Sequence, residues 1–552
     1  MRPAKRLGIL ALVGMTVLWI GIVWIWSPSP VALTVDDSFY YLQTARNVAE
    51  GYGSTFDRVQ PTNGYHPLWL LALVPVAGME GGDGPVRWAL TLQLLLVGAG
   101  MLWLARSGGF LRRTPSVLAF ALLSFSGTKI LVNGQESALQ WFLLCGLTAV
   151  LATGRPELPS PSSSPGLRRT VVGILGGLAT LARLEAVIFG LAAALLPVLW
   201  PRRALPGDRA MDRDRDGTDR RPGLRIPTPP LSHPRIWIAP GIVCGTSILY
   251  GAWSLASFGH PLPVSAAIKS RYAGVGWPAV LWALVAAVIA GGAYRRLVRT
   301  EVTGSERDET RLRALAPLLV YCVFFGTLHS SGGWRWALQI WYLAPFLLLA
   351  VTSAGWAVER ISADLPGAGR RAWIGILVLA AAGYLGIAVA GWSHRLDPTS
   401  YSTDLAARRT GRWIRDSIPP RASLAGWDIG STAWYSGRGI TNLEGLAASW
   451  EYKREVLDRG RVAEYVNEIR RFDHLVQPLP AWMLRGEGTL RYAGVDLAPW
   501  SVLRSECVRF RSVVPWRDAW RRVHLVLGRS DGPRLGILRP SDLCPVSGSR
   551  PR

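Results

Sequence analysis

The stretch TVDDSFYYLQTARNVAEGYG, residues 34–53, places two carboxylates directly after the first long apolar run of the chain. That run, residues 7–26, has the length and composition of a transmembrane helix. A carboxylate at the edge of a bilayer is costly to desolvate and is often functional. The stretch also has the pattern of an amphipathic helix that begins at Asp36 or Asp37 and ends before Gly51, so one aspartate can cap this helix. The other aspartate is then available for chemistry at the membrane edge, and helix capping alone is the alternative role of the pair.

The composition predicts a polytopic α-helical membrane protein. Hydrophobic residues make up 49% of the 552 residues and include 26 Trp, and the mean hydropathy is positive, which exceeds what a soluble domain carries. Windows of about 19 residues give about eleven apolar segments. These segments are 7–26, 86–105, 115–133, 138–152, 170–182, 186–200, 236–257, 278–294, 314–329, 338–356 and 372–392.

The net charge of +24 indicates membrane topology and not nucleic-acid binding. A nucleic-acid domain gathers Lys and Arg on one soluble face, whereas here they lie in short segments between apolar runs. The connections after every second span and the N-terminal tail carry these residues, so the positive-inside rule makes them cytoplasmic. The first run lacks a small-x-small cleavage site and is interpreted as an uncleaved span. We therefore expect a multi-pass protein of the cell (inner) membrane with a cytoplasmic N-terminus.

The pattern divides the chain into two domains. Residues 1–392 form the transmembrane domain, and residues 27–85 are its first outward loop. Residues 393–552, called here the C-terminal domain, lose the long apolar runs and are numerous enough for a core of their own. An odd number of spans that begins inside places this domain outside the membrane. Its helical segment STDLAARRTGRWIRDSI and its strand-like segments SLAGWDIG, FDHLVQPL and RVHLVLG predict a mixed α/β fold.

The five cysteines divide between the two domains. Cys145, Cys244 and Cys322 lie in predicted spans, where we expect them to behave as small hydrophobic residues. Cys507 and Cys544 both lie in the C-terminal domain. An exterior location permits a disulfide, so we predict that these two are bridged or close.

The segment NGYHPLW, residues 63–69, follows the acidic stretch in the first outward loop. Pro61 to Gly64 predict a turn, and Pro67 is well placed at the first turn of a helix. The apolar run that follows is too short to cross a bilayer, so we expect an interfacial helix.

The acidic pair after the first span, the amphipathic helix and the NGYHPLW segment together resemble the GT-C superfamily of membrane glycosyltransferases. The resemblance is to the types similar to protein O-mannosyltransferases and lipid A aminoarabinose transferases, and it covers about the first 150 residues best. It implies an inverting hexosyl or pentosyl transfer on the outer face, from a polyprenyl-phosphate sugar to an envelope glycan, lipid or protein. It also implies that the acidic pair carries the base, with Asp36 the leading candidate and Asp37 its neighbour. Glu136, in the second outward loop, matches a further acidic position.

Transfer to a hydroxyl needs a base near the acceptor and cations near the departing phosphate. Lys269 lies in a predicted outward loop of a chain that has only four lysines, so it is a candidate for the phosphate, as are Arg271 and Arg46. The alternative is that these cations contact lipid headgroups at the interface. In the turn ARLEA, Arg183 and Glu185 can likewise form a plain ion pair or contact substrate.

A divalent cation is a second open question, since some members of the superfamily bind one beside the acidic motif. Asp36, Asp37, Glu136 and His66 have suitable donor atoms, but no HExxH or paired CxxC motif indicates a dedicated metal site. His66 precedes a proline, so capping or packing is its alternative role. The chain has no GxxxxGK[ST] motif and no GxGxxG after a strand, which disfavours a nucleotide-sugar or ATP-driven reaction.

The C-terminal domain is expected to be accessory. Trp427, Asp428, Tyr435 and Glu444 are candidates for a sugar-binding face, and core or loop-capping roles are the alternative. Two other functions compete with glycosyl transfer. A flippase or transporter of a lipid-linked glycan also needs charge near the membrane, but internal repeats typical of transporters are not evident. The other is a noncatalytic scaffold for envelope assembly.

Overall fold

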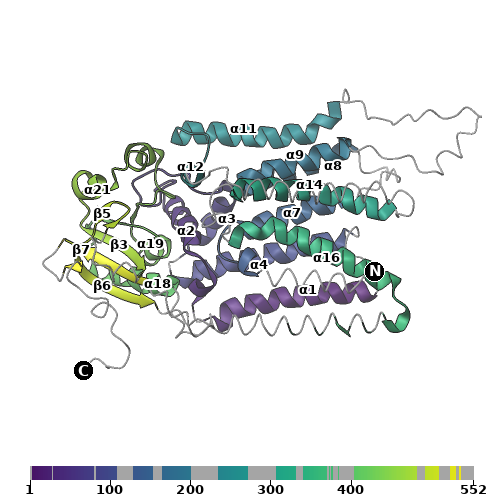
Figure 1. Cartoon of the computed structure of the whole chain (residues 1–552), viewed down its shortest axis with the longest axis horizontal. Helices are drawn as coiled ribbons and strands as arrows, with labels where there is room; N and C mark the ends of the chain where they lie inside the picture. Colours follow the sequence, from purple (N-terminus) through teal and green to yellow (C-terminus); the bar gives the residue numbers. More distant parts are fainter. Residues whose placement is uncertain are drawn as a thin grey trace, which may run out of the picture.

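The computed structural model describes residues 3–27, 29–79, 82–107, 128–152, 165–199, 234–270, 306–330, 340–369, 403–480, 491–508, 522–529 and 534–535, and residues 372, 375, 376, 379 and 383. Long helices lie side by side in one bundle, and a smaller domain with a β-sheet lies against one end of it (Figure 1). The N-terminus lies toward the opposite end of the bundle. The segment α2, which contains the acidic pair, lies between the bundle and the sheet.

The bundle is formed by the apolar runs of the sequence. Its long helices are α1 (Pro3–Gly21), α4 (Asp83–Arg106), α7 (Ser137–Ala152), α8 (Pro165–Ala182), α9 (Val187–Leu199), α11 (Ile238–Phe258), α14 (Glu306–Ser330) and α16 (Ala344–Asp364). Short helical segments begin, continue or join them: η1 (Ile22–Trp26), η2 (Pro30–Leu33), α6 (Thr128–Leu131), η3 (Leu184–Ala186), η4 (Pro234–Trp237) and η6 (Ile340–Leu343).

Within the described residues, three helical stretches are long and apolar enough to cross a membrane, by length and composition. They are Ile9–Trp26, Asp83–Arg106 and Pro234–Phe258. The predicted span 278–294, and most of 115–133 and of 372–392, lie outside the described residues. The total of about eleven spans therefore stays a prediction.

Residues 27–85, predicted to form the first outward loop, contain two helices, and the first of them has the predicted amphipathic pattern. In α2 (Asp36–Ala49), Phe39, Leu42 and Ala45 recur at helical spacing and are fully buried in the bundle core. The chain turns away soon after the helix ends, where Gly51 has a φ of 85°. Only glycine adopts this left-handed conformation at little cost.

The second helix, α3 (Pro67–Ala77), follows the NGYHPLW turn as predicted, with a proline in its first turn. Its 11 residues are too few to cross a bilayer. Trp69 is fully buried, and its indole N–H donates to the carbonyl oxygen of Gly134 at 3.1 Å. This bond joins the first outward loop to the segment that precedes α7.

The C-terminal domain has the predicted mixed α/β fold. Its five-stranded sheet has the order β2-β1-β3-β7-β6, in which β1 pairs in parallel with β2 and β3 while β7 is antiparallel to β3 and β6. The strands are β1 (Leu424–Gly426), β2 (Thr441–Asn442), β3 (His474–Pro480), β6 (Ser501–Val508) and β7 (Arg522–Gly528), and β4 (Arg491–Tyr492) pairs separately with β5 (Val495–Asp496). Helical segments are α18 (Thr403–Ser417), α19 (Gly430–Ser436), α20 (Trp450–Tyr452), η7 (Lys453–Leu457), α21 (Val462–Glu464) and η8 (Tyr465–Ile469). The predicted helix coincides with α18, and the three predicted strands coincide with β1, β3 and β7.

The short helix α19 attaches the C-terminal domain to the bundle. Trp434 and Tyr435 of this helix are buried in the same core as the bundle helices. The Tyr435 hydroxyl donates to the carboxylate of Asp83 at 2.9 Å, and Arg408 of α18 pairs with the same carboxylate at 2.7 Å. The two domains therefore share one core, and Asp83, Arg408 and Tyr435 form a polar cluster between them at the start of α4.

The cysteines are only partly described. Cys145 and Cys322 are buried, as expected for small hydrophobic residues, while Cys244 is exposed on the surface of α11. Cys507 lies in β6, and Cys544 lies outside the described residues. The predicted bridge between them stays a prediction.

Candidate functional site

The two aspartates of the opening stretch both lie in the first turn of α2. The N-cap residue is Val35, and its side chain makes no capping hydrogen bond, so the prediction that Asp36 or Asp37 caps this helix is wrong. Successive residues of an α-helix point about 100° apart around its axis. The two carboxylates therefore face different neighbours.

Asp36 faces the C-terminal domain and binds the N-terminus of α19. Its carboxylate accepts the backbone N–H of Gly430 at 2.8 Å, and it accepts both the N–H and the hydroxyl of Ser431 at 2.8 and 2.7 Å. The first N–H groups of a helix have no partner within the helix, so this contact is a cap supplied from another domain. Burial, with a contribution from the charge of Asp428, raises the pKa of Asp36 to about 6, and the hydrogen bonds oppose that shift.

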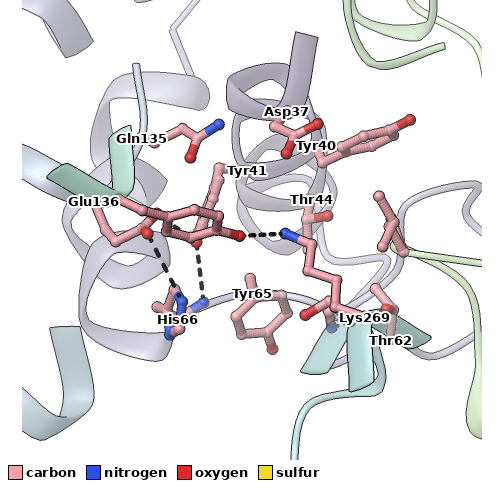
Figure 2. Close-up of a pocket in the computed structure, with 15 residues that line it drawn as sticks. Asp37, Tyr40, Tyr41, Thr44, Thr62, Tyr65, His66, Gln135, Glu136 and Lys269 are labelled. Atoms are coloured by element: carbon pink, nitrogen blue, oxygen red, sulfur yellow. Dashed lines mark hydrogen bonds and ion pairs between the residues drawn. The ribbon is translucent and has the colours of Figure 1, made fainter. Parts of the chain in front are cut away.

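Asp37 faces a cavity enclosed by α2, the turn before α3, the segment before α7, α12 (Val264–Ser270) and the C-terminal domain. Figure 2 shows Asp37 and Lys269 on separate walls of this cavity, with Glu136 and His66 across from Lys269. The lining residues are Asp37, Tyr40, Tyr41, Thr44, Thr62, Gly64, Tyr65, His66, Gln135, Glu136, Ser265, Lys269, Tyr342, Leu446 and Ala447.

The charge of Asp37 is tuned by its surroundings. Burial raises the pKa of the Asp37 carboxyl above its ordinary value, because an apolar environment disfavours the charged form. The ammonium group of Lys269 opposes this shift, while the carboxylates of Asp428 and Glu136 add to it. Asp37 is thus a half-buried carboxylate whose pKa is raised by the loss of contact with water and lowered by one nearby cation.

Lys269 brings a positive charge to the cavity from α12. Its ammonium group donates to the hydroxyl of Tyr342 at 3.0 Å. Burial works against the charged form, but Tyr342 and the carboxylate of Asp37 outweigh it and raise the pKa of Lys269 above its ordinary value. The lysine is therefore protonated at neutral pH, and it faces Asp37 across the cavity.

Glu136 belongs to a buried network on the wall across from Lys269. Its carboxylate accepts the hydroxyl of Tyr41 at 2.9 Å and pairs with Arg183 at 3.2 Å. Arg183 is only 1% exposed and also pairs with Glu185 at 3.0 Å, so the ion pair expected in the ARLEA turn is present. Burial alone would raise the pKa of Glu136, but His66 and Arg183 outweigh it and hold that pKa below its ordinary value.

His66 lies next to this network at the start of α3. Its Nε2 is 3.8 Å from the carboxylate of Glu136, and its backbone N–H donates to the hydroxyl of Tyr41 at 3.3 Å. Burial lowers the pKa of the imidazole, although Glu136 opposes the shift. His66 presents a polar imidazole to the cavity.

The C-terminal domain was expected to be accessory, but it supplies one wall of the cavity. Leu446 and Ala447 line the cavity directly. Asn442 donates from its side-chain amide to the hydroxyl of Tyr40 at 3.0 Å. The backbone carbonyl of Leu446 lies so close to Gly64 that a Cβ on this glycine would be 1.9 Å from the oxygen. The site is complete only when the C-terminal domain is docked.

The predicted sugar-binding face of the C-terminal domain is not assembled as one surface. Trp427 is 3% exposed and belongs to the core of the domain, and Tyr435 is bonded to Asp83, so the alternative core role applies to both. The backbone N–H of Asp428 donates to the carboxylate of Glu444 at 3.0 Å. Burial and the charge of Asp428 raise the pKa of Glu444 well above its ordinary value.

Of the other predicted cations, Arg46 lies outside the cavity. The guanidinium of Arg46 stacks on the ring of Trp434 at 3.4 Å and donates to the carbonyl oxygen of the same residue at 3.1 Å. Arg46 therefore lies against the C-terminal domain and not in the cavity. Arg271 lies outside the described residues, and its predicted role stays a prediction.

The four candidate metal ligands do not converge. Both carboxylate oxygens of Asp36 are bound to α19, away from the cavity that Asp37, Glu136 and His66 share. In the part of the chain that the structure describes, no three His, Cys, Asp or Glu side chains are placed to hold one metal ion. We therefore derive no step through a divalent cation.

The cavity also contains residues that sequence reasoning missed. The most informative are the positions of α2 that line it beside Asp37, namely Tyr40, Tyr41 and Thr44. With Asp37 they follow the spacing i, i+3, i+4 and i+7, which defines one face of a helix. This polar and aromatic stripe was a signal that favoured Asp37 over Asp36 for the cavity.

Solved structures of two membrane enzymes match the fold over most of this chain. The crystal structure of ArnT from Cupriavidus metallidurans bound to undecaprenyl phosphate matches 95% of this chain and 99% of its own, with a TM-score of 0.52 and 13% sequence identity. The apo oligosaccharyltransferase from Archaeoglobus fulgidus matches 87% of this chain and 69% of its own, with a TM-score of 0.50 and 11% identity. Both are GT-C glycosyltransferases. The fold of this chain is GT-C-like.

Sequence comparisons add less. A family model described as a domain of unknown function (DUF8728) matches residues 397–524, within the C-terminal domain. No curated protein matches the chain significantly. The GT-C-like fold thus rests on the three-dimensional arrangement, which persists at identities where sequence similarity is not detected.

Proposed function

We propose that this protein is a membrane glycosyltransferase of the inverting GT-C type, which moves a sugar from a polyprenyl-phosphate donor to a hydroxyl of an envelope glycan, lipid or protein on the outer face. The observation that carries the proposal is the placement of Asp37 and Lys269 in one cavity at the end of a bundle of apolar helices. The GT-C-like fold supports it.

Asp37 is the proposed general base. It takes the proton of the acceptor hydroxyl while the acceptor oxygen forms a bond to the anomeric carbon of the donor. The bond between that carbon and the phosphate oxygen breaks, and its electron pair leaves with the polyprenyl phosphate. A half-buried carboxylate with a raised pKa suits this task, because it is a stronger base than one with an ordinary pKa. Asp36 is unsuited, since both its oxygens are bound to α19.

Lys269 is the proposed partner of the departing phosphate. A cation already in place stabilises the negative charge that develops on the leaving oxygen. The lipid tail of such a donor remains among apolar helices while its phosphate and sugar reach the cavity. The undecaprenyl phosphate in the ArnT structure supports a donor of this class.

The network of Glu136, Arg183 and Tyr41 is proposed to position the wall across from Lys269. Arg183 is paired with two carboxylates, so its charge is already compensated. A buried network of ion pairs of this kind restricts side-chain motion, and a rigid wall holds a reacting sugar in one orientation.

The experiment that tests the function uses the purified full-length protein in lipid nanodiscs. It is incubated with a panel of polyprenyl monophosphate sugars and an extract of envelope acceptors, and the release of polyprenyl phosphate is measured. Release from at least one donor, with the sugar recovered on an acceptor, is the expected result. No release from any donor by folded protein would contradict the proposal.

The proposed outer-face location has its own test. Reporter proteins are fused after residue 220 and after residue 400, and their location is assayed in cells. We expect the first reporter to be cytoplasmic and the second to be exported, as the Arg distribution indicates. The opposite location of either reporter would contradict the topology.

A further inference from the structure

The short helix that carries Lys269 begins with a hydrogen bond from outside itself. α12 spans seven residues, Val264–Ser270, and its first N–H groups have no partner within the helix. The N–H of Val264 donates to the side-chain oxygen of Asn63 at 3.0 Å. Asn63 lies about 200 positions earlier in the chain, in the turn before α3. The side chain of Asn63 therefore ties α12, the helix that carries Lys269, to the turn before α3.

Asn63 uses its whole amide group in this contact. Its NH₂ group donates to the carbonyl oxygen of Leu262 at 3.0 Å and to the hydroxyl of Ser254 at 2.9 Å. The residue is fully buried. The three bonds bind the end of α11, the connecting turn and the start of α12 to one side chain, and a buried amide with all these partners is held firmly in place.

The residues that follow Asn63 line the same cavity as Lys269. Gly64, Tyr65 and His66 all belong to its lining. Gly64 is in close contact with the backbone of Leu446, so the C-terminal domain prevents this turn from moving outward. Asn63 therefore stands where the turn, α12 and the docked domain meet.

We infer that Asn63 is a positioning residue that fixes Lys269 for the donor phosphate by holding α12 against the turn before α3. The inference rests on the proposed function for the identity of the phosphate. The placement of Lys269 itself can be measured without any activity.

Asn47 offers a matched control. It is also a fully buried asparagine of the first outward loop, and its NH₂ group donates to the carbonyl oxygens of Thr55 at 2.9 Å and Phe56 at 3.0 Å. Its side-chain hydrogen bonds with Thr55, Phe56 and Arg58 lie within the loop and do not reach α12. Replacing either asparagine by alanine removes a similar set of buried hydrogen bonds, but only Asn63→Ala releases α12.

The first experiment measures how fast Lys269 reacts with an amine-selective reagent in the purified full-length protein, by mass spectrometry. The chain has only four lysines, so the labelled site is unambiguous. We expect Asn63→Ala to speed labelling of Lys269 by roughly five- to tenfold, the change expected for losing the single buried hydrogen bond to Val264 that holds α12, while Asn47→Ala leaves it at the wild-type rate. Ser254→Ala removes one partner only and should give a smaller increase. Equal labelling rates in the two asparagine variants would overturn the inference.

The second experiment measures the donor concentration needed for half-maximal transfer. Asn63→Ala should raise it by roughly tenfold with a smaller fall in the maximal rate, and it should add nothing further in the Lys269→Ala background, because residues that act through one another are not additive. An equal rise in both backgrounds would show that Asn63 does not act through Lys269. If the wild-type protein transfers no sugar, the proposed function fails, and the labelling rates still decide the role of Asn63.

Discussion

The two faces of α2 differ in what their polar groups contact. On the docking face, Asp36 and Arg46 are bound to α19 of the C-terminal domain through hydrogen bonds and a stacked ring. On the cavity face, Asp37 and Tyr41 lie among the residues that line the cavity. Identical carboxylates at consecutive positions therefore have different tasks, because one residue of helix turns the side chain through about 100°.

The difference shows that buried charge next to a site is not by itself evidence of catalysis. Asp36 and Asp37 are both half-buried, and the loss of contact with water raises the pKa of each. What separates them is the set of partners: donors from another domain surround Asp36, and a cation across a cavity faces Asp37.

The largest expected effect is on the cavity face. Asp37→Asn keeps the size of the side chain but removes the basic oxygen, so the transfer rate should fall by roughly 10² to 10⁴ fold, the usual worth of general base catalysis. The rate at saturating donor and the thermal unfolding midpoint are measured together. An unchanged midpoint shows that the loss is chemical, and full activity at wild-type protein levels would remove Asp37 from the mechanism.

The next effect concerns the cation across the cavity. Lys269→Ala should raise the donor concentration for half-maximal transfer by roughly 10- to 100-fold, the worth of a hydrogen bond to a charged group. The maximal rate should fall less, because the lost contact is made in the bound donor as well as in the transition state. A donor titration of both proteins checks this. If the donor concentration for half-maximal transfer were unchanged, Lys269 would not bind the donor phosphate, and the alternative role, contact with lipid headgroups, would apply.

A smaller effect is expected on the docking face. Asp36→Asn leaves one acceptor oxygen for α19, so the protein should lose about 1 to 2 kcal/mol of stability and retain its transfer rate below the unfolding temperature. Thermal unfolding, together with the rate of proteolysis at the domain junction, measures the loss. Ser431→Ala, which removes one of the three hydrogen bonds, should weaken docking less. Loss of transfer without loss of stability would contradict the assignment of Asp36 to docking.

The smallest effect is a shift in pH dependence. Transfer requires Asp37 to be deprotonated, and Lys269 lowers the pKa of that carboxyl against the upward effect of burial. Removing the ammonium group therefore raises the pKa further, so the acid limb of the pH–rate profile should move to higher pH in Lys269→Ala. Tyr342→Phe, which keeps the lysine charge, should move it less. A shift to lower pH would contradict the charge balance assigned to the cavity.

Local patterns in the sequence predicted much of the fold. The spacing of Phe39, Leu42 and Ala45 predicted α2, and alternating residues predicted three strands of the C-terminal sheet. These features depend on neighbours within a few residues, which a single sequence records directly. The rarity of lysine also drew attention to Lys269, which the structure places in the cavity.

The division of labour between the aspartates was not predicted, because it depends on distant partners. The ligands of Asp36 lie 394 and 395 positions further along the chain, and the partner of Arg46 lies 388 positions away. Composition and periodicity do not report such contacts. The polar stripe of Asp37, Tyr40, Tyr41 and Thr44 was the one local signal that separated the two carboxylates.

The central claim is that the cavity face of α2, and not its docking face, performs glycosyl transfer. It is tested most directly by the time course of polyprenyl phosphate release from one polyprenyl-phosphate sugar, measured for the wild type, Asp36→Asn and Asp37→Asn in the same nanodisc preparation at a temperature where all three are folded. The account predicts that Asp36→Asn releases the lipid at a rate close to that of the wild type, while Asp37→Asn is slower by roughly 10² fold or more. Equal rates in the two variants, or a greater loss in Asp36→Asn, would contradict it.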